Sequence, residues 1–491
     1  MHILHKSTGK VVAPIVWLLT VFLPALAVVL VGLVIFLENR NPEKTVAWLV
    51  VLAALPIVGF LIYLLLGRNA RKRKLFHRKH AYSDRLLRIV AKQQRKLTED
   101  EVLHRYGVDQ KKRLVRLLLN NAAAPLRSNN RAKVLTNGEQ KFASFFEAVE
   151  QAKHHIHLEY YIFKDDEIGG DTKRLLIRKV QEGVQVRLIL DGLGSRAVPE
   201  AFWQELRDSG VEVVMFFPVR FPWISSRLNF RNHRKIVIVD GRVGFLGGMN
   251  IGDEYLSRNQ KMGFWRDTHL RIEGESVHFL QATFLSDWMY LTNQMIDGVP
   301  YYPKFRELER HMTQIAASGP DSDWESIRQV FFTALATAER KIYIETPYFV
   351  PGEDLIMALK TAALSGVDVR LIVQGIPEYK LTYWASRSYY ESLLKAGVKI
   401  YEYQKGILHA KVLMVDDVVG SVGSANMDIR SFELNFETSA LLYDPEVVAR
   451  LEQDFWQDVE DSRLVQEEAF AKRPLSERLK ESGARLLSPL L

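Results

Sequence analysis

Two long apolar stretches open the chain. Residues 11–37 and 46–67 contain no charged side chain. At a rise of about 1.5 Å per residue, a helix over either stretch would exceed the roughly 30 Å hydrocarbon core of a bilayer. The prolines within them are tolerated in membrane helices, where neighbouring groups satisfy the freed carbonyls. We therefore expect a hairpin of two transmembrane helices.

The first stretch has a competing interpretation as a cleaved signal peptide. Lys6 and Lys10 precede it, and residues 25–27 resemble a cleavage site. The apolar run continues to residue 37, well past that site. The second stretch would still anchor the cleaved product.

Basic residues follow the second stretch with no acid among them: Arg68, Arg71, Lys72, Arg73, Lys74, Arg78 and Lys79. The connector at 38–44 balances its basic residues against acids. Because cytoplasmic loops carry the basic excess, we expect both termini and the catalytic domain in the cytoplasm, in a multi-pass protein of the cell membrane. The formal net charge is +8, so the rest of the chain is nearly neutral. The cluster either binds the anionic leaflet or only sets the topology.

Beyond residue 130, short apolar runs alternate with amphipathic stretches. Helical patterns at 170–182 and 354–365 each precede a Gly-Val step into an apolar run. This alternation predicts an α/β fold with helices packed on a mixed sheet.

The same order of blocks occurs twice. Residues 156–163, 183–190 and 209–213 parallel residues 342–349, 366–373 and 396–400. A repeat of this length indicates a duplicated domain rather than a solenoid. We expect two α/β halves facing each other. The expected parts are the hairpin at 1–67, a basic juxtamembrane linker at 68–130, the halves at 131–315 and 316–470, and a helical tail at 471–491.

One short motif appears in both halves, as His233-x-Lys235-x4-Asp240 and as His409-x-Lys411-x4-Asp416. His and Lys are two apart, so on a strand they project from one face, which can hold a phosphate. The four residues between Lys and Asp are apolar in both copies, which predicts a buried strand with a turn at the aspartate. Two ordinary core strands are the alternative, and the matching flanks disfavour it.

The matching flanks include an asparagine, Asn250 after the first motif and Asn426 after the second. Gly248 in the first half corresponds to Ser424 in the second. One copy therefore lacks a hydroxyl, and the two halves cannot be equivalent.

The duplicated motif with its downstream asparagine resembles the phospholipase D superfamily, over residues 133–465. With two apolar spans before it, the chain is similar to the bacterial cardiolipin synthases of that superfamily. The segments 41–48 and 264–274 add to this likeness. The resemblance implies that a phosphatidyl group passes between two phosphatidylglycerol molecules, which gives cardiolipin and glycerol.

The resemblance also implies roles for single residues. The candidate catalytic positions are His233, Lys235, Asp240, His409, Lys411 and Asp416. The candidate phosphate contacts are Asn250, Ser424 and Asn426, and the candidate orienting acids are Asp267 and Glu437. Of the motif positions, the two aspartates are expected to be turn residues rather than catalytic groups.

The chemistry of two histidines around one phosphodiester divides the transfer into two steps. A neutral imidazole attacks phosphorus, the opposite imidazolium protonates the departing alkoxide, and a phosphatidyl-histidine forms. We favour His233 as the nucleophile. Each histidine needs a partner at its other nitrogen to set the tautomer.

We expect no cofactor and no metal. The exchange of one phosphodiester for another is close to thermoneutral, and the sequence has no nucleotide-binding G-x-x-x-x-G-K-[ST] loop. The cluster of His154, His155 and His157 lacks accompanying carboxylates or cysteines. The absence of cysteine excludes disulfide and thiolate chemistry.

Three other functions share some of these features. A phospholipase D-type hydrolase, or a transphosphatidylase with another lipid donor or alcohol acceptor, would use the same motifs and stays open. A nuclease would be expected to show a broad basic surface, whereas this catalytic region is nearly neutral, so nucleic acid is not an expected partner. Intact motifs in both halves disfavour a non-catalytic scaffold. The expected partners are phosphatidylglycerol and anionic membrane lipid.

Two further segments have open interpretations. Residues 216–230 are aromatic and basic and have no counterpart in the second half. They form either a lip that guides lipid to His233 or a buried packing loop. Residues 474–491 carry leucines at helical spacing beside basic residues, and a helix packed on the catalytic core is favoured over one that lies on the membrane.

Overall fold

The structure is a computed structural model that describes residues 111–218 and 229–488, with scattered helical residues between 25 and 63. The expected spans, most of the linker and the centre of the 216–230 insertion lie outside the described residues. Among those that are described, no helix is both long enough and apolar enough to cross a membrane. The transmembrane hairpin therefore stays a prediction. Both α/β halves belong to one compact unit.

The first half is built on a seven-stranded mixed sheet with the order β1-β8-β6-β5-β2-β3-β4. Its strands are β1 (Asn130–Thr136), β2 (His155–Tyr160), β3 (Gln185–Asp191), β4 (Glu212–Phe216), β5 (Lys235–Val239), β6 (Val243–Gly247) and β8 (Thr268–Gly274). Its helices are α9 (Asn137–Glu150), α10 (Glu167–Gln181), α11 (Glu200–Asp208) and α12 (Val277–Thr292). β2, β3 and β4 run parallel, and β2 pairs antiparallel with β5.

The second half is built on an eight-stranded sheet with the order β19-β13-β12-β10-β15-β16-β18-β9. Its strands are β9 (Thr313–Ser318), β10 (Lys341–Glu345), β12 (Asp368–Gln374), β13 (Lys399–Tyr403), β15 (Val412–Val415), β16 (Val419–Gly423), β18 (Glu437–Leu442) and β19 (Ser462–Leu464). Its helices are α13 (Ser326–Ala336), α14 (Glu353–Leu364), α15 (Lys380–Arg387), α16 (Tyr390–Leu394), α17 (Ile429–Glu433) and α18 (Pro445–Glu460).

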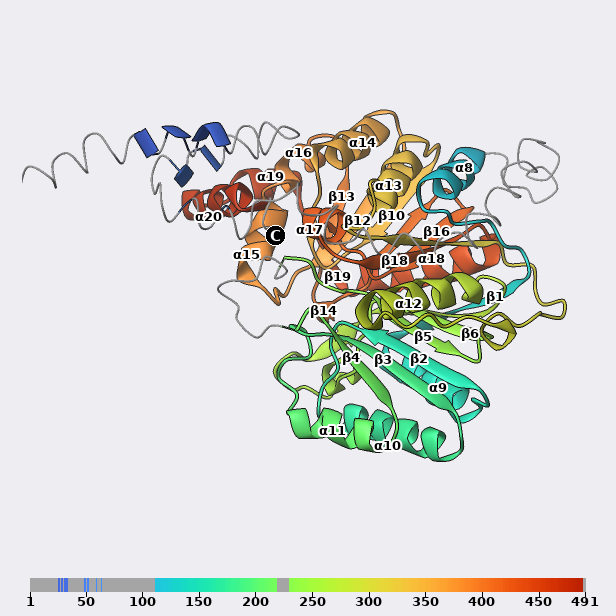
Figure 1. The fold of residues 1–491 in the computed structure, drawn as a ribbon. Helices are drawn as coiled ribbons and strands as arrows, with labels where there is room; N and C mark the ends of the chain where they lie inside the picture. The colour runs from blue at the N-terminus through green and yellow to red at the C-terminus, as the bar shows by residue number, and fades with distance from the viewer. Residues whose placement is uncertain are drawn as a thin grey trace, which may run out of the picture. The chain divides into compact units, whose positions relative to one another are not determined.

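The two sheets have the same topology. Read from β9 to β13, the second sheet repeats the strand order and directions of the first, and β19 is added beyond β13. Each sheet has its own apolar core. The prediction of two duplicated α/β halves is confirmed. Figure 1 shows the two halves against each other, with α12 and α18 near their junction.

Two small sheets and one bridge complete the arrangement. β7 (Phe264–Arg266) of the first half pairs parallel with β14 (Gly406–Leu408) of the second. Asn232 and Phe436 form a parallel bridge at the matching place on the other side. β11 (Phe349–Val350) pairs parallel with β17 (Met427–Asp428) inside the second half. The first two pairings join the halves directly beside the motif histidines.

The segment before the first half packs on the second half. α8 (Lys112–Asn121) buries Leu114, Leu118 and other apolar residues in the core of the second half. Gln314 on β9 donates to the carbonyls of Val115 and Ala124, at 3.2 and 2.6 Å. The end of the expected linker is thus part of the catalytic body.

The C-terminal segment forms two helices, α19 (Glu467–Ala471) and α20 (Leu475–Leu486). α20 packs against α15 of the second half. The expectation of a tail helix packed on the catalytic core is met by this contact.

Candidate active site

The two inter-half pairings place each motif histidine beside an acid of the opposite half. His233 N donates to Phe436 O at 3.0 Å, so the next residue, Glu437, lies beside His233. His409 N donates to Arg266 O at 2.7 Å, so Asp267 lies beside His409. Parallel pairing of the preceding residues is the local cause in both places.

Each histidine bonds its acid through Nδ1. His233 Nδ1 lies 2.9 and 3.1 Å from the two carboxylate oxygens of Glu437. His409 Nδ1 lies 2.8 Å from Asp267 Oδ2. The bonds leave Nε2 of each ring to face a reacting group, and an acid at Nδ1 stabilises the imidazolium. Both acids are fully buried.

Burial keeps the free histidines neutral. It lowers the pKa of His409 to about 3, with the charge of Lys411 acting in the same direction. It also lowers the pKa of His233, although Glu437 opposes the shift. Burial works against ionisation of Glu437, yet His233 and Lys235 hold its pKa below the usual range. A neutral imidazole beside an ionised acid is the state that a nucleophile requires.

The two motif lysines are buried with their histidines. Lys235 Nζ and Lys411 Nζ each donate to the carbonyl of the histidine two residues before, at 2.6 Å. Burial lowers the pKa of Lys235 to about 7 and that of Lys411 to about 8. The charge of Lys411 also lowers the pKa of Lys235, which indicates that the motifs of the two halves share one site.

The asparagines after the motifs are both buried. Asn250 Nδ2 donates to Tyr255 Oη at 2.7 Å, and Tyr255 packs on Trp265, whose ring centroid is 5.1 Å from that of His409. Asn426 Nδ2 donates to Asp428 Oδ2 at 3.0 Å. Two aromatic rings thus connect Asn250 to His409, whereas Asn426 is held by an acid of its own half.

Ser424 has a partner that the sequence did not indicate. Its hydroxyl donates to Glu437 Oε2 at 2.5 Å and accepts from Thr438 N at 3.0 Å. Asn435 Nδ2 donates to the other oxygen of Glu437 at 3.2 Å. In this arrangement Ser424 holds the acid that orients His233.

The first half holds its acid differently. A Cβ on Gly248, the counterpart of Ser424, would lie 2.0 Å from Asp267 Oδ1. Asp267 Oδ1 instead accepts from Thr268 N at 2.8 Å. A serine at 248 would collide with the carboxylate. The position of Asp267, the shorter of the two acids, therefore requires a glycine at 248. This gives a physical reason for the unequal halves.

Two buried arginines of the site were missed at the sequence level. Arg234 Nε donates to Glu437 O at 3.2 Å, and Arg266 Nη1 donates to Asp267 O at 2.7 Å. Arg234 pairs with Asp287 and lies 3.9 Å from Glu159. Arg266 pairs with Asp458 at 2.7 Å and lies 3.6 Å from Glu345.

These two arginines make matching contacts in space, although they do not stand at equivalent positions of the sequence repeat. Arg234 follows His233, where the second motif has Ala410, and Arg266 precedes Asp267, where the second half has Phe436. The Phe436 ring lies 5.3 Å from the Arg234 guanidinium. Glu159 and Glu345 stand at equivalent positions of the repeat, and that equivalence was the available signal for a pair of buried cations.

Asp240 and Asp416 do not belong to this group of residues. Each follows the last residue of the motif strand, so on an extended chain it lies roughly 23 Å from the motif histidine. Asp240 accepts from the backbone N–H groups of residues 153–155, at 2.8 to 2.9 Å. Asp416 accepts from Lys111 Nζ at 2.6 Å and from backbone N–H groups of 339–341.

Both aspartates adopt positive φ, 53° and 51°, a turn conformation that Asp tolerates better than most residues. Both aspartates thus lie at the turns that the motif predicts, away from the histidines. They tie the far end of each motif strand to the start of a neighbouring strand.

The histidine cluster forms a hydrogen-bonded network in the first half. His155 Nε2 and His157 Nδ1 bond the two ends of the Gln281 amide, at 2.9 and 2.8 Å. Burial lowers the pKa of His155 to about 4. Within the described part of the chain, no group of three or more His, Cys, Asp or Glu side chains is placed to hold a metal ion.

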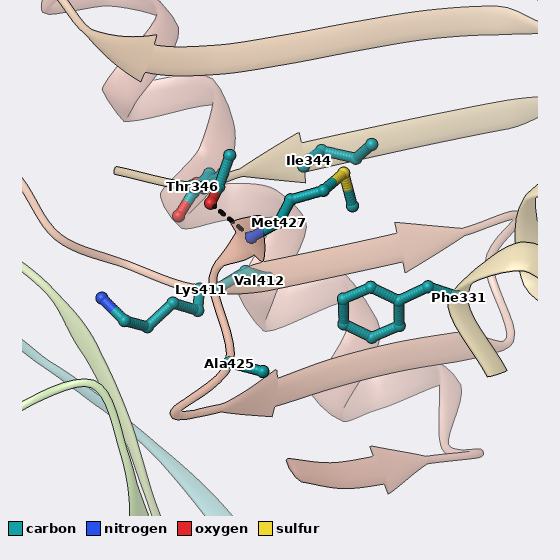
Figure 2. Close-up of a pocket in the computed structure, with 8 residues that line it drawn as sticks. Phe331, Ile344, Thr346, Lys411, Val412, Ala425 and Met427 are labelled. Carbon is teal, nitrogen blue, oxygen red and sulfur yellow. Dashed lines mark hydrogen bonds between the residues drawn. The ribbon is translucent and has the colours of Figure 1, made fainter. Parts of the chain in front are cut away.

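A small cavity lies behind Lys411, lined by Phe331, Ile344, Glu345, Thr346, Lys411, Val412, Ala425 and Met427. Its volume of about 10 Å³ is comparable to the space of one water molecule. Figure 2 shows Lys411 extending away from Phe331 and Met427, and Met427 N bonded to Thr346 Oγ1. The cavity is far too small for a lipid headgroup, so it belongs to the packing beneath the site.

Known proteins resemble this chain along most of its length. A family model described as "Cardiolipin synthase, PLD-like domain" matches residues 145–288 and 331–459. A second, "Phospholipase_D-nuclease N-terminal", matches residues 25–68. A cardiolipin synthase of Geobacillus kaustophilus is 47% identical over 95% of this chain and 92% of its own length. Cardiolipin synthase 2 of Bacillus anthracis is 46% identical over 94% of this chain and 90% of its own length.

A solved structure shares the fold. The phosphatidylserine synthase of Haemophilus influenzae Rd KW20 aligns with 77% of this chain and 100% of its own, with a TM-score of 0.56 and 16% sequence identity. At that identity the likeness concerns the fold alone.

Proposed function

Because the chain belongs to the cardiolipin synthase family of phospholipase D-like proteins, we propose that it transfers a phosphatidyl group between two phosphatidylglycerol molecules. The products are cardiolipin and glycerol. The observation that carries the proposal is the pair of crossed His–acid contacts, His233 with Glu437 and His409 with Asp267. Two oriented imidazoles around one site supply a nucleophile and an acid.

In the first step, His233 Nε2 attacks the phosphorus of one phosphatidylglycerol. The bond from phosphorus to the headgroup glycerol oxygen breaks, and the His409 imidazolium gives that oxygen its Nε2 proton. Glycerol leaves, and the phosphatidyl group remains on His233. Asp267 stabilises the His409 imidazolium before the transfer.

In the second step, the free headgroup hydroxyl of another phosphatidylglycerol attacks the same phosphorus. His409, now neutral, accepts the hydroxyl proton, and the bond from phosphorus to His233 breaks. Cardiolipin forms, and both histidines regain their starting protonation. One phosphodiester replaces another, so no nucleotide enters the balance.

Lys235 and Lys411 hold the non-bridging oxygens of the phosphodiester, together with the amides of Asn250 and Asn426. Because both lysines are buried, their positive charge favours the binding of an anion in the site. The bound phosphodiester in turn raises the pKa of each lysine and of His409, because its negative charge favours their protonated forms. Substrate binding therefore favours protonation of His409, the general acid.

The domain boundaries and membrane arrangement expected from the sequence complete the proposal. Two spans at 11–37 and 46–67 anchor a cytoplasmic catalytic body, and the basic residues at 68–79 lie at the anionic leaflet. The match of residues 25–68 to an N-terminal family model supports this part. Membrane lipid is then present at the site continuously.

The test is lipid analysis of a bacterial host that lacks its own cardiolipin, with and without this chain. Cardiolipin should appear only with the intact chain. Purified protein in phosphatidylglycerol liposomes should release glycerol in equal amount to cardiolipin, with chelator present and without nucleotide. Phosphatidic acid as the sole product would indicate a hydrolase, and a product with another headgroup would indicate a different acceptor.

A further inference from the structure

The helix α20 packs on the second half through its charged residues. Its inward face carries Glu477, Glu481 and Ala484, and Glu481 is 2% exposed. Arg387 donates to Glu477 at 3.0 Å and to Glu481 at 3.3 Å, and Arg473 donates to Glu481 at 2.8 Å. Ion pairs, rather than leucines, attach this helix.

The leucines of α20 face outward. Leu475, Leu479 and Leu486 are 71%, 65% and 82% exposed. At 3.6 residues per turn they lie within about 40° of one another, on the side opposite Glu477 and Ala484. An amphipathic helix normally turns its apolar side to the core. Here that side is left for a partner outside the catalytic body.

Basic residues flank the leucine row on both sides. Arg478 and Arg485 lie on one side and Lys480 on the other, and all three are exposed. An apolar row between cations is the pattern of a helix that lies in the surface of an anionic bilayer. Phosphatidylglycerol and cardiolipin are anionic, so the charge complements the lipids of the proposed reaction.

The helix packed against α20 also begins beside exposed apolar and aromatic side chains. α15 packs against α20 and begins after the exposed Tyr379, and Figure 1 shows the two helices together. Tyr379 is 58% exposed and Leu381 is 42% exposed. The ring of Tyr379 lies 6.2 Å from that of Tyr348.

α15 is joined in turn to the strands beside the phosphate contacts. Ser386 Oγ accepts from Phe349 N at 3.2 Å, and Phe349 belongs to β11. β11 pairs with β17, which directly follows Asn426. A lipid surface against α20 and the start of α15 would therefore contact elements that connect directly to Asn426.

We propose that the outward face of α20, formed by Leu475, Leu479 and Leu486, docks in the surface of an anionic phospholipid bilayer, together with the exposed Tyr379 and Leu381 at the start of α15. The docking presents the site to membrane-resident substrate. The identity of that lipid rests on the proposed function, whereas the docking surface stands on exposure and charge.

The first test uses the absence of native cysteine. Full-length Leu479→Cys is labelled with an environment-sensitive fluorophore and reconstituted in phosphatidylglycerol liposomes. Gln204→Cys, on α11 in the first half, is the control. We expect a blue-shifted emission at 479 that shallow nitroxide-labelled lipids quench, and neither effect at 204.

Two results would overturn the proposal. An unshifted emission at 479 would mean that the row stays in water. A shifted emission that nitroxide lipids fail to quench would mean that protein covers it, either another part of the chain or a second copy.

The second test separates docking from catalysis. The triple variant L475S/L479S/L486S should raise the KM for phosphatidylglycerol in liposomes by about fivefold or more and leave kcat within about twofold. Its rate on dispersed short-chain phosphatidylglycerol should not change. The matched control, M295S/V299S, removes two apolar side chains that are 72% and 78% exposed in the first half.

Unchanged liposome kinetics in the triple variant would contradict the proposal, as would an equal loss on both substrates. A wild-type chain that makes no cardiolipin would refute the proposed function instead. The labelling result at 479 is independent of that outcome.

Discussion

Each motif histidine depends on an acid that the opposite half supplies. Glu437 follows β17 and α17 of the second half, yet it bonds His233 of the first, and Asp267 of the first half bonds His409 of the second. In the proposed mechanism, neither half by itself contains a complete nucleophile or a complete acid. The duplication is a functional unit only when the halves are joined.

The first prediction concerns the two histidines. His233→Ala and His409→Ala should each reduce cardiolipin synthesis by more than about a thousandfold, because nucleophile and acid are both required. Synthesis of cardiolipin from labelled phosphatidylglycerol in liposomes measures this. His278→Ala, on α12 outside the site, is the control and should retain activity.

Activity within about tenfold of wild type in either variant would contradict the two-histidine mechanism. Labelled phosphatidyl-enzyme, trapped by quenching in a denaturant at neutral pH, should carry its label on His233. A label on His409 would reverse the two roles.

The second prediction concerns pH. Burial lowers the pKa of Lys235 to about 7 and that of Lys411 to about 8. A lysine holds a phosphate only when it is protonated, and that form is lost as the pH rises through its pKa. Therefore kcat/KM, which reports the free enzyme, should fall above about pH 7 to 8.

The profile of kcat should hold to higher pH, because the bound phosphodiester raises both lysine pKa values. Rates measured from pH 6 to 10 at low and saturating lipid separate the two profiles. A kcat/KM that stays flat to about pH 9 would show that the lysines remain charged in the free enzyme.

At the residue scale, sequence reasoning found the groups but not their pairing. The motif spacing predicts that His and Lys share a face, and that inference is local to one strand. The contact between His233 and Glu437 depends on how two distant segments meet, which no spacing specifies. Ser424 shows the same limit, since its partner is the acid that this meeting brings close.

At the scale of elements, the parallel pairing of β7 with β14 positions the part of the site around His409. This pairing places Arg266 beside Asp458 and Glu345. Arg234 makes the matching ion pair from a position inside the first motif. Burial raises the pKa of Glu345 well above the usual range, with Asp458 adding to the rise and Arg266 opposing it. Burial also raises the pKa of Asp458, although Arg266 opposes that rise, so the two carboxyl groups compete for a single guanidinium.

The third prediction tests this arrangement. Arg266→Met should lower the free energy of unfolding by about 3–5 kcal/mol, because it leaves a buried carboxylate without its cation. Adding Asp458→Asn should restore part of the loss. Glu345→Gln alone should have a smaller effect, since burial favours the neutral form of that side chain. Denaturant unfolding of the detergent-solubilised protein measures all three.

No recovery on adding Asp458→Asn would contradict the arrangement, as would a Glu345→Gln effect as large as that of Arg266→Met. Arg340→Met is the control. Arg340 pairs with Asp417 on the surface, so its loss should have little effect on the free energy of unfolding.

The sequence predicts which segments form strands and helices better than it predicts which elements pack against one another. The apolar run after Lys235 is a fully buried strand, as the motif predicts. The place of β9 at the edge of the second sheet and the packing of α8 on that same half were not expected. Both are long-range contacts between apolar faces, and such faces have many partners that a periodic pattern cannot distinguish.

At the scale of the whole molecule, the catalytic body and the expected membrane spans are defined by different properties. The duplicated halves are defined by their own packing. The expected spans at 11–37 and 46–67 are defined by length and by the absence of charge, a property of composition rather than of contacts. Their role is therefore best tested by what the anchored enzyme makes.

The last prediction concerns product choice. The phosphatidyl-histidine intermediate can react with water or with a second phosphatidylglycerol, and cardiolipin forms only while lipid occupies the acceptor side. An anchored enzyme meets acceptor lipid continuously, whereas a released one meets it on collision. Removal of residues 1–67 should therefore lower the ratio of cardiolipin to phosphatidic acid, measured in the same detergent-free phosphatidylglycerol liposomes.

The proposed α20 surface refines this expectation. It would keep part of the truncated enzyme at the bilayer, so the triple leucine variant should lower the ratio further in the truncated chain than in the full-length one. An unchanged ratio with only a lower total rate would show that the acceptor is chosen inside the site. In that case the anchor would supply the enzyme with substrate but would have no part in excluding water from the second step.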